Sequence, residues 1–262
     1  MLKIAHLREF TRFARETACD AGQMLLKMSR RRHRIALKGR VNLVTEADLA
    51  SEKFIVGAIG KRYPHHSILA EEGAARNNDS EFKWIIDPLD GTTNYTHAFP
   101  FYCVSIGLEY CGEMVAGAVY DPERDEMFSA FDKGGSFLNR RRIQVSTETR
   151  LERALLATGF PYDISSSREN NLKYFNRFAR LARGVRRAGS AALDLCYLAC
   201  GRFDGFWELK LHPWDTAAGT VIVQEAGGKV TDFKGRKYSI YDKYILAGNR
   251  HIHGRMKQVL AS

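Results

Sequence analysis

The sequence predicts a protein of the α+β or α/β class, with helices and sheets stacked in layers. After two helical segments, residues 67–120 hold short runs rich in β-branched and aromatic residues, separated by glycine turns. From about residue 140, strand and helix patterns alternate. No linker rich in proline, glycine or serine separates the halves, so we expect an N-terminal α+β subdomain at 1–140 and a C-terminal α/β subdomain at 141–262, packed closely together.

The first helix is predicted by apolar residues that recur at steps of three and four and form one stripe. They are Phe10, Phe13, Ala14, Thr17, Ala18, Ala21, Leu25 and Met28. A short apolar strand follows at 41–44. Thr45 with Asp48 three residues later is a capping box, so the second helix should begin there and end near Tyr63 and Pro64.

The following segments predict a largely antiparallel sheet and then an alternating half. Strands are expected at 67–70, 82–86, 103–108 and 114–120. The second half predicts strands at 154–158 and 185–187, a helix at 171–182, and a helix opened by Gly189 and Ser190 and ended after Cys200. Asp215 should open a further helix, which ends at the glycine pair 227–228.

The charge of the chain is unusual, since 40 Lys and Arg residues against 30 Asp and Glu residues give +10. Seven of the basic residues lie in one segment without acids: Lys27, Arg30, Arg31, Arg32, Arg34, Lys38 and Arg40. The rest of the chain is nearly balanced, and one local patch argues less for nucleic acid than a basic face spread over the fold. We therefore expect nucleic acid not to be the main partner, and the patch to be a rim that attracts phosphate, a partner surface or a solvated face.

The composition, 45% hydrophobic and 27% charged, excludes disordered, collagen-like and heptad-repeat chains. No apolar run approaches the roughly 18–20 residues of a membrane span, and charges interrupt residues 1–9, where a signal peptide would be apolar. Five cysteines without a Cys-x-x-Cys pair favour reduced thiols, and Cys196 and Cys200 are expected in the core rather than as zinc ligands. These features predict a cytoplasmic protein with no membrane partner.

Acidic residues beside chain turns form four candidate groups. They are Glu71-Glu72 after a predicted strand, Asp87-Pro88-Leu89-Asp90-Gly91 after another, Asp215 at a helix start, and Asp48 beside Thr45. Pro88 fixes one backbone torsion and Gly91 frees another, so this turn can aim two carboxylates and the Leu89 carbonyl into one space. Oxygen ligands without His or Cys suit Mg²⁺. Taken singly, each group is better explained as a helix cap, a tight turn or a solvated edge, and only their combination favours a metal site.

Two stretches carry a resemblance to a known family. Residues 84–95 read Trp-Ile-Ile-Asp-Pro-Leu-Asp-Gly-Thr-Thr-Asn-Tyr, and residues 213–219 read Pro-Trp-Asp-Thr-Ala-Ala-Gly. With these motifs the chain resembles the inositol monophosphatase family of Mg²⁺-dependent, lithium-sensitive phosphatases, over nearly its whole length. Its arginine-rich segment before Gly189 is similar to that of bacterial and archaeal members. The resemblance implies an alternating αβαβα sandwich of the sugar phosphatase type, a homodimer, two or three Mg²⁺ ions and inhibition by Li⁺.

The resemblance also implies roles for the acidic residues. Glu71, Asp87 and the Leu89 carbonyl look like ligands of one metal ion, and Asp87, Asp90 and Asp215 look like ligands of a second. Glu71 also resembles a ligand of a third, weaker ion, and Glu72 resembles a residue that supports the ligands. Asp48 and Thr92 resemble the pair that orients and deprotonates the attacking water, with Thr45 nearby.

Further residues are expected to bind the substrate. The segment Gly91-Thr92 supplies amides for phosphate, Gly189, Ser190 and Ala191 resemble the family segment that meets substrate hydroxyls, and Glu208 resembles the acceptor for a sugar or inositol hydroxyl. Lys38 stands before the strand that leads to Thr45, where it would attract phosphate. Arg186 and Arg187 could bind a second phosphate, or be structural, or lie at a dimer surface.

The predicted function is hydrolysis of inositol 1-phosphate or a related small sugar or polyol phosphate, by in-line attack of metal-activated water without a phosphoenzyme. Fructose 1,6-bisphosphate, 3′-phosphoadenosine 5′-phosphate and histidinol phosphate are alternative substrates, because a fold and a metal site do not fix the substrate. The alternative from another class is a protein that interacts with transcription machinery, as some bacterial relatives do.

Overall fold

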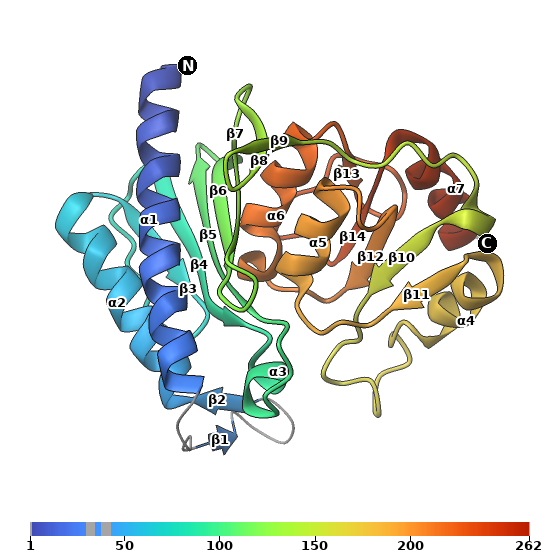
Figure 1. Cartoon of the computed structure of the whole chain (residues 1–262), viewed down its shortest axis with the longest axis horizontal. Helices are drawn as coiled ribbons and strands as arrows, with labels where there is room; N and C mark the ends of the chain where they lie inside the picture. Colours follow the sequence, from blue (N-terminus) through green and yellow to red (C-terminus); the bar gives the residue numbers. More distant parts are fainter. Residues whose placement is uncertain (1, 30–34, 38–42, 262) are drawn as a thin grey trace.

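The computed structural model describes residues 2–29, 35–37 and 43–261. Helices and sheets alternate in layers, with two helices outside a large sheet, two helices between that sheet and a smaller one, and two helices on the far side (Figure 1). This is the predicted αβαβα sandwich.

The first layer consists of helices α1 (Ile4–Ser29) and α2 (Glu46–Arg62). The predicted apolar stripe of α1 is its buried face, and Leu25 on it is fully buried. Thr45 and Asp48 form the predicted capping box of α2, and Tyr63 is its C-cap. The short strands β1 (Ile35–Leu37) and β2 (Leu43–Thr45) pair antiparallel before α2, while residues 41 and 42 of the expected strand lie outside the described part of the chain.

The large sheet has seven strands in sequence order from β3 to β9. Their bounds are β3 (Ser67–Ala70), β4 (Phe82–Asp90), β5 (Cys103–Tyr110), β6 (Glu113–Asp121), β7 (Glu126–Phe131), β8 (Gly135–Leu138) and β9 (Arg141–Ile143). Only the β3–β4 pair is parallel, so the sheet is largely antiparallel, as predicted. Strand β9 pairs with β8, and the sheet therefore extends slightly past residue 140.

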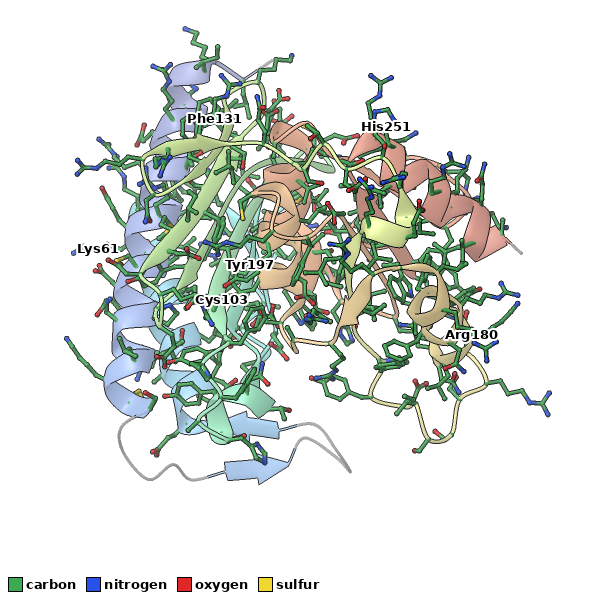
Figure 2. The ribbon with its side chains drawn as sticks, turned by 45° about the vertical axis from the view of Figure 1, so that its right-hand side comes forward. Lys61, Cys103, Phe131, Arg180, Tyr197 and His251 are labelled. Atoms are coloured by element: carbon green, nitrogen blue, oxygen red, sulfur yellow. The ribbon has the colours of Figure 1, made fainter. Side chains whose placement is uncertain are left out.

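The middle layer consists of α5 (Ala191–Ala199) and α6 (Pro213–Glu225). Two glycines let α6 lie against the backbone of the large sheet: a Cβ at Gly117 would lie 2.7 Å from Ala218 Cα, and one at Gly107 would lie 2.9 Å from Ala217 Cβ. Cys103 on β5 and Tyr197 on α5 both belong to the hydrophobic core that this layer shares with the large sheet (Figure 2). The layer therefore sits closer to the sheet than ordinary side chains would permit.

The smaller sheet has five strands in the order β11-β10-β12-β14-β13. Their bounds are β10 (Leu155–Thr158), β11 (Gly184–Arg186), β12 (Gly205–Leu209), β13 (Lys229–Thr231) and β14 (Tyr244–Gly248). Strand β10 pairs in parallel with β11 and β12, and β14 pairs antiparallel with β12 and β13. Helices α4 (Leu172–Leu181) and α7 (Arg250–Ala261) form the outer layer, while the short α3 (Thr92–Thr96) and a 3₁₀ turn (Leu151–Arg153) lie in connections.

The sequence prediction was wrong about the start of α6. The helix begins at Pro213, and Asp215 is its third residue rather than its opening residue, because proline at the first helical position has its backbone already set for the helix. The patterns also left β7–β9, β12–β14 and α7 unassigned. All five cysteines are free, Cys196 is buried in the core and Cys200 is half-buried beside it. In the described residues, no helix combines the length and apolarity needed to cross a membrane.

Candidate active site

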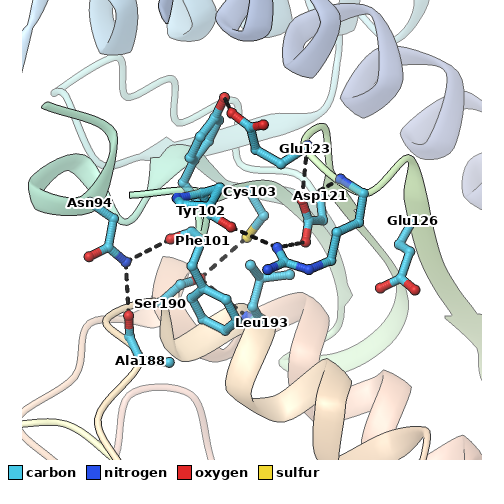
Figure 3. A network of polar contacts seen from close by, with 12 residues as sticks. Asn94, Phe101, Tyr102, Cys103, Asp121, Glu123, Glu126, Ala188, Ser190 and Leu193 are labelled. Atoms are coloured by element: carbon cyan, nitrogen blue, oxygen red, sulfur yellow. Dashed lines mark hydrogen bonds and ion pairs between the residues drawn. The ribbon is translucent and has the colours of Figure 1, made fainter. Parts of the chain in front are cut away.

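A cavity lies between the two sheets, where strand β4 ends and helices α5 and α6 begin. Its wall receives Glu71 and Asp90 from the first half of the chain and Ser190, Glu208 and Asp215 from the second. Asn94 joins the two halves here, because its amide nitrogen donates to the Phe101 carbonyl at 2.7 Å and to the Ala188 carbonyl at 2.9 Å (Figure 3). The site therefore depends on both halves.

Asp48 is held at the first turn of α2 by two threonines. One of its carboxyl oxygens accepts from the Thr45 backbone N–H at 2.8 Å and from the Thr45 hydroxyl. The other accepts from the Thr92 hydroxyl at 2.9 Å. Burial raises the pKa of the Asp48 carboxyl above its ordinary value, and these hydrogen bonds oppose the rise. The structure thus brings together Asp48 and Thr92, the pair predicted to act on water, with Thr45 beside them.

The turn from Asp87 to Gly91 is fixed by backbone contacts. The Ser51 hydroxyl on α2 donates to the Pro88 carbonyl at 2.8 Å, and the Leu89 N–H donates to Asp87 at 3.1 Å. The pairing of β4 with β5 is irregular between Asp87 and Asp90, so these two residues do not follow the regular alternation of the strand. Gly91 has φ of 102°, and a Cβ there would lie 3.0 Å from the Phe101 carbonyl oxygen, so this position requires glycine.

Burial and like charges act on both aspartates of this turn. Burial, then Glu71, raises the pKa of the Asp87 carboxyl well above its ordinary value. Burial, then Asp215, raises the pKa of Asp90 to about 7. The Ser190 hydroxyl and the Ala192 N–H both donate to Asp90 at 2.7 Å, which connects β4 to the start of α5. Negative charge is therefore concentrated here without enough compensation.

Asp215 lies on the first turn of α6. Its carboxylate accepts from the His212 N–H at 2.7 Å, in a capping box with His212 as N-cap. The His212 ring stacks on Trp214 with centroids 4.9 Å apart, which holds the helix start in place. Asp215 therefore combines a capping role with a place in the cavity wall.

The two glutamates after β3 have different positions. Glu71 lines the cavity, and the described lining residues do not include Glu72. The Glu72 N–H donates to the Glu52 carboxylate at 2.7 Å, and Glu52 also accepts from the Ala74 N–H at 3.1 Å. Glu52, on α2, thus fixes the loop that carries Glu71.

Glu208, on β12, lies in the wall of the cavity. Burial, then Asp215, raises its pKa to about 8. A Cβ at Gly159 would lie 2.1 Å from a Glu208 carboxyl oxygen, so Gly159 makes room for this side chain. Asn171 fixes Gly159 in turn, because its amide donates to the Gly159 carbonyl at 2.6 Å.

The remaining predicted substrate residues lie in two groups. Gly189, Ala191 and Arg187 line the cavity with Ser190. Arg186 is exposed on β11, outside the described lining residues, and its guanidinium lies 3.4 Å from the neighbouring Val185 carbonyl. Lys38 lies outside the described residues.

The oxygen donors of the acidic residues suit a hard divalent cation, although the described side chains do not converge on a single point. In the described parts of the chain, no three His, Cys, Asp or Glu side chains converge enough to enclose an ion. Asp90 and Asp215 are instead turned to protein donors. All candidate donors are oxygens, and a cation would relieve the repulsion that raises the pKa of Asp87 and Asp90.

Sequence reasoning missed several residues of this site. Glu52 lies one helical turn after Asp48, and that spacing could have revealed it. Asp194 is a charged residue in an otherwise apolar helix, which is also a signal. Tyr162 and Lys210 line the cavity from connections, where no periodic pattern marks them.

An αβαβα sandwich with an acidic cavity between its layers, and with an Asp48–Thr92 pair hydrogen-bonded to the turn before Asp90, is the arrangement expected of a hydrolase of phosphate esters. The family model for the inositol monophosphatase family matches residues 6–262. An inositol-1-monophosphatase of Synechocystis is 46% identical over 98% of this chain and 90% of its own length. A protein of Pseudomonas aeruginosa named Nus factor SuhB is 43% identical over 90% of each chain. The solved inositol monophosphatase of Anabaena (Nostoc) superposes with a TM-score of 0.90 at 44% identity, over 98% of this chain and 96% of that one.

The chain therefore belongs to the inositol monophosphatase family and is a phosphatase.

Proposed function

We propose that the protein is a Mg²⁺-dependent phosphomonoesterase whose substrate is inositol 1-phosphate or a similar small polyol phosphate. The observation that carries the proposal is the meeting of the Asp48–Thr92 pair with the turn that holds Asp87 and Asp90. The Thr92 hydroxyl lies 2.9 Å from Asp48 and 3.2 Å from the Leu89 carbonyl, so it connects the two groups.

Thr92 and Asp48 orient the attacking water. Because the Thr92 hydroxyl donates its hydrogen to Asp48, its oxygen is free to accept a hydrogen from water. Asp48 stabilises that arrangement and takes up the proton as water loses it. Thr45 holds the Asp48 carboxyl in this orientation from the opposite side.

Glu71, Asp87, the Leu89 carbonyl, Asp90 and Asp215 would hold two or three Mg²⁺ ions, with Glu72 behind them. When bound, the ions supply compensation for negative charge on phosphate and on the leaving oxygen. Backbone amides of Gly91 and Thr92 would contact the phosphate, Gly189, Ser190 and Ala191 would meet substrate hydroxyls, and Glu208 would accept a substrate hydroxyl. Inhibition by Li⁺, a homodimer and a cytoplasmic location belong to the same proposal.

A panel of phosphate esters tests this function. Inositol 1-phosphate, fructose 1,6-bisphosphate, histidinol phosphate and 3′-phosphoadenosine 5′-phosphate are incubated with the protein in Mg²⁺ and in EDTA, and phosphate release is measured. We expect the highest kcat/KM for inositol 1-phosphate and no release in EDTA. Thr92→Val should lower kcat by about 100-fold or more, because it removes the hydroxyl that orients water. Thr93→Val, at an exposed neighbour, is the matched control. Turnover that survives both EDTA and Thr92→Val would contradict the proposal.

A second candidate function is binding to transcription machinery, which the similarity to the Pseudomonas protein named Nus factor SuhB favours. Asp90→Asn should abolish phosphatase activity and leave such binding intact. Pull-down of purified RNA polymerase and Nus proteins with the wild type and with this variant measures it. Absence of binding by the folded wild type would refute this candidate.

A further inference from the structure

The loop that joins β10 to α4 places an exposed aromatic side chain at the cavity (Figure 1). Tyr162 lines the cavity together with Glu71 and Asp215. It is 60% exposed, which is the largest exposed fraction among the large hydrophobic side chains of the described residues. Aromatic side chains in the wall of a pocket supply much of the contact area for a ligand, so this ring is available to one.

The hydroxyl end of Tyr162 lies near the acidic residues of the site. Burial, then Glu71 and Asp215, raises the pKa of this hydroxyl above its ordinary value, and Asp90 and Asp87 add to the rise. Carboxylates act in this way only over short distances, because water and salt screen them. The phenol oxygen is therefore close to the carboxylates, while much of the ring stays open to solvent.

Lys210, directly after β12, holds the loop that carries Tyr162. Its ammonium group donates to the Asp163 carboxylate at 2.6 Å and to the Ser167 hydroxyl at 2.8 Å. The Asp163 carbonyl also accepts from the Ser167 N–H at 2.9 Å, so these two residues form one turn directly after Tyr162. The Lys210 side chain is only 21% exposed, so its bonds to the turn are partly shielded from water.

A second lysine attaches the later part of the same loop. Lys243, directly before β14, pairs with Glu169. The Lys210 N–H donates to the Lys243 carbonyl at 2.7 Å, so both lysines stand at one end of the β12–β14 pair. The loop is thus attached at two points to the strand pair that carries Glu208, and this fixes the place of Tyr162 relative to the cavity.

Resting on the proposed phosphatase function, we propose that Lys210 positions Tyr162 to pack its ring against the carbon ring of the substrate, so that the enzyme favours cyclic over acyclic polyol phosphates. With the phosphate at the carboxylates, the organic part of the ester extends to the place where Tyr162 stands. A cyclic polyol has C–H groups on the faces of its ring, and these lose contact with water when they pack on an aromatic face. An acyclic polyol has no such face. Tyr162 is thus a specificity-determining residue, and Lys210 is a positioning residue.

Substitutions of Tyr162 test its part in specificity. The measured quantity is the ratio of kcat/KM for inositol 1-phosphate, which is cyclic, to kcat/KM for glycerol 2-phosphate, which is acyclic. Tyr162→Ala should lower this ratio about tenfold, mainly through a higher KM for inositol 1-phosphate, and Tyr162→Phe should preserve it because the ring remains. Tyr241→Ala is the matched control, since Tyr241 is 53% exposed and lies outside the described lining residues, and it should leave the ratio unchanged.

A double-variant cycle tests the positioning role of Lys210. Lys210→Met should lower the ratio about three- to tenfold, and Lys210→Arg should retain it, because arginine can still pair with Asp163. In the Tyr162→Ala background, Lys210→Met should cause no further fall, because the ring that it positions is already absent. If Lys210→Met does not fold, Asp163→Asn removes the same ion pair from the loop side, where the carboxylate is 49% exposed, and takes its place in the cycle.

An unchanged ratio in Tyr162→Ala would overturn the inference. A further fall in the double variant would show that Lys210 acts on the substrate by itself and would overturn its positioning role. Both outcomes require a wild type that releases phosphate. A wild type that hydrolyses none of the esters would instead refute the proposed function, so the two failures are distinct.

Discussion

Replacing Asp90 by asparagine should change the stability of the metal-free protein in a pH-dependent way. Burial and Asp215 raise the pKa of Asp90 to about 7 from an ordinary value of 3.8. A carboxyl with a raised pKa stabilises the fold at acid pH, and that contribution is lost as pH rises through the folded-state pKa. Each pKa unit corresponds to about 1.4 kcal/mol, so the full contribution is on the order of 4 kcal/mol, of which roughly 2–3 kcal/mol falls between pH 5 and pH 8.

Asp90→Asn removes this contribution but keeps an oxygen that can accept from Ser190 and Ala192. Urea denaturation of EDTA-treated wild type and variant at pH 5 and pH 8 measures the effect. Relative to the wild type, the variant should gain roughly 2–3 kcal/mol in free energy of unfolding from pH 5 to pH 8, and Mg²⁺ at pH 8 should raise the Tm of the wild type more than that of the variant. Glu152→Gln, at an exposed acid, should show no such gain. An equal difference between wild type and Asp90→Asn at both pH values would refute the reasoning.

Three further substitutions test the supports of the site. Gly91→Ala should lower the free energy of unfolding by about 1–3 kcal/mol, because φ is 102° and the Phe101 carbonyl is close. Gly57→Ala, in open space on α2, should raise it by up to about 1 kcal/mol. Thermal denaturation compares the two variants, and equal effects would count against a strained turn at Gly91. Glu52→Gln should weaken the bonds to the two N–H groups of the Glu71 loop and cost about 1–3 kcal/mol, measured by urea denaturation; no loss would show that the loop is held otherwise. Gly159→Ala should displace Glu208 and raise the KM for inositol 1-phosphate by about tenfold or more; an unchanged KM would remove Glu208 from the substrate site.

Much of the fold could be predicted because local signals and tertiary packing agree. The stripe of α1 and the capping box at Thr45 and Asp48 each specify one element without help from the rest of the chain. Strands β12 and β14 escaped prediction, because both are almost entirely buried and show no alternation. The turn from Asp87 to Gly91 could be predicted because Pro88 fixes one backbone torsion and Gly91 permits a positive φ.

The part of the cavity wall formed by the second half of the chain could not be predicted in the same way. Asp194, Glu208 and Arg187 line one cavity only because β12 pairs with β10 and α5 packs against both, and spacing along the chain does not encode that arrangement. The sequence raised a second-phosphate role for Arg186 and Arg187 together. The structure places only Arg187 in the cavity wall among the described residues.

The close packing of α6 against Gly107 and Gly117 limits which substitutions the protein can accept during evolution. Because α6 lies close to the main chain of β5 and β6 at these two glycines, the separation between Asp215 and the carboxylates of β4 depends on both positions having no side chain. A methyl group at either glycine would shift Asp215 itself, so these two positions limit sequence drift although neither lines the cavity.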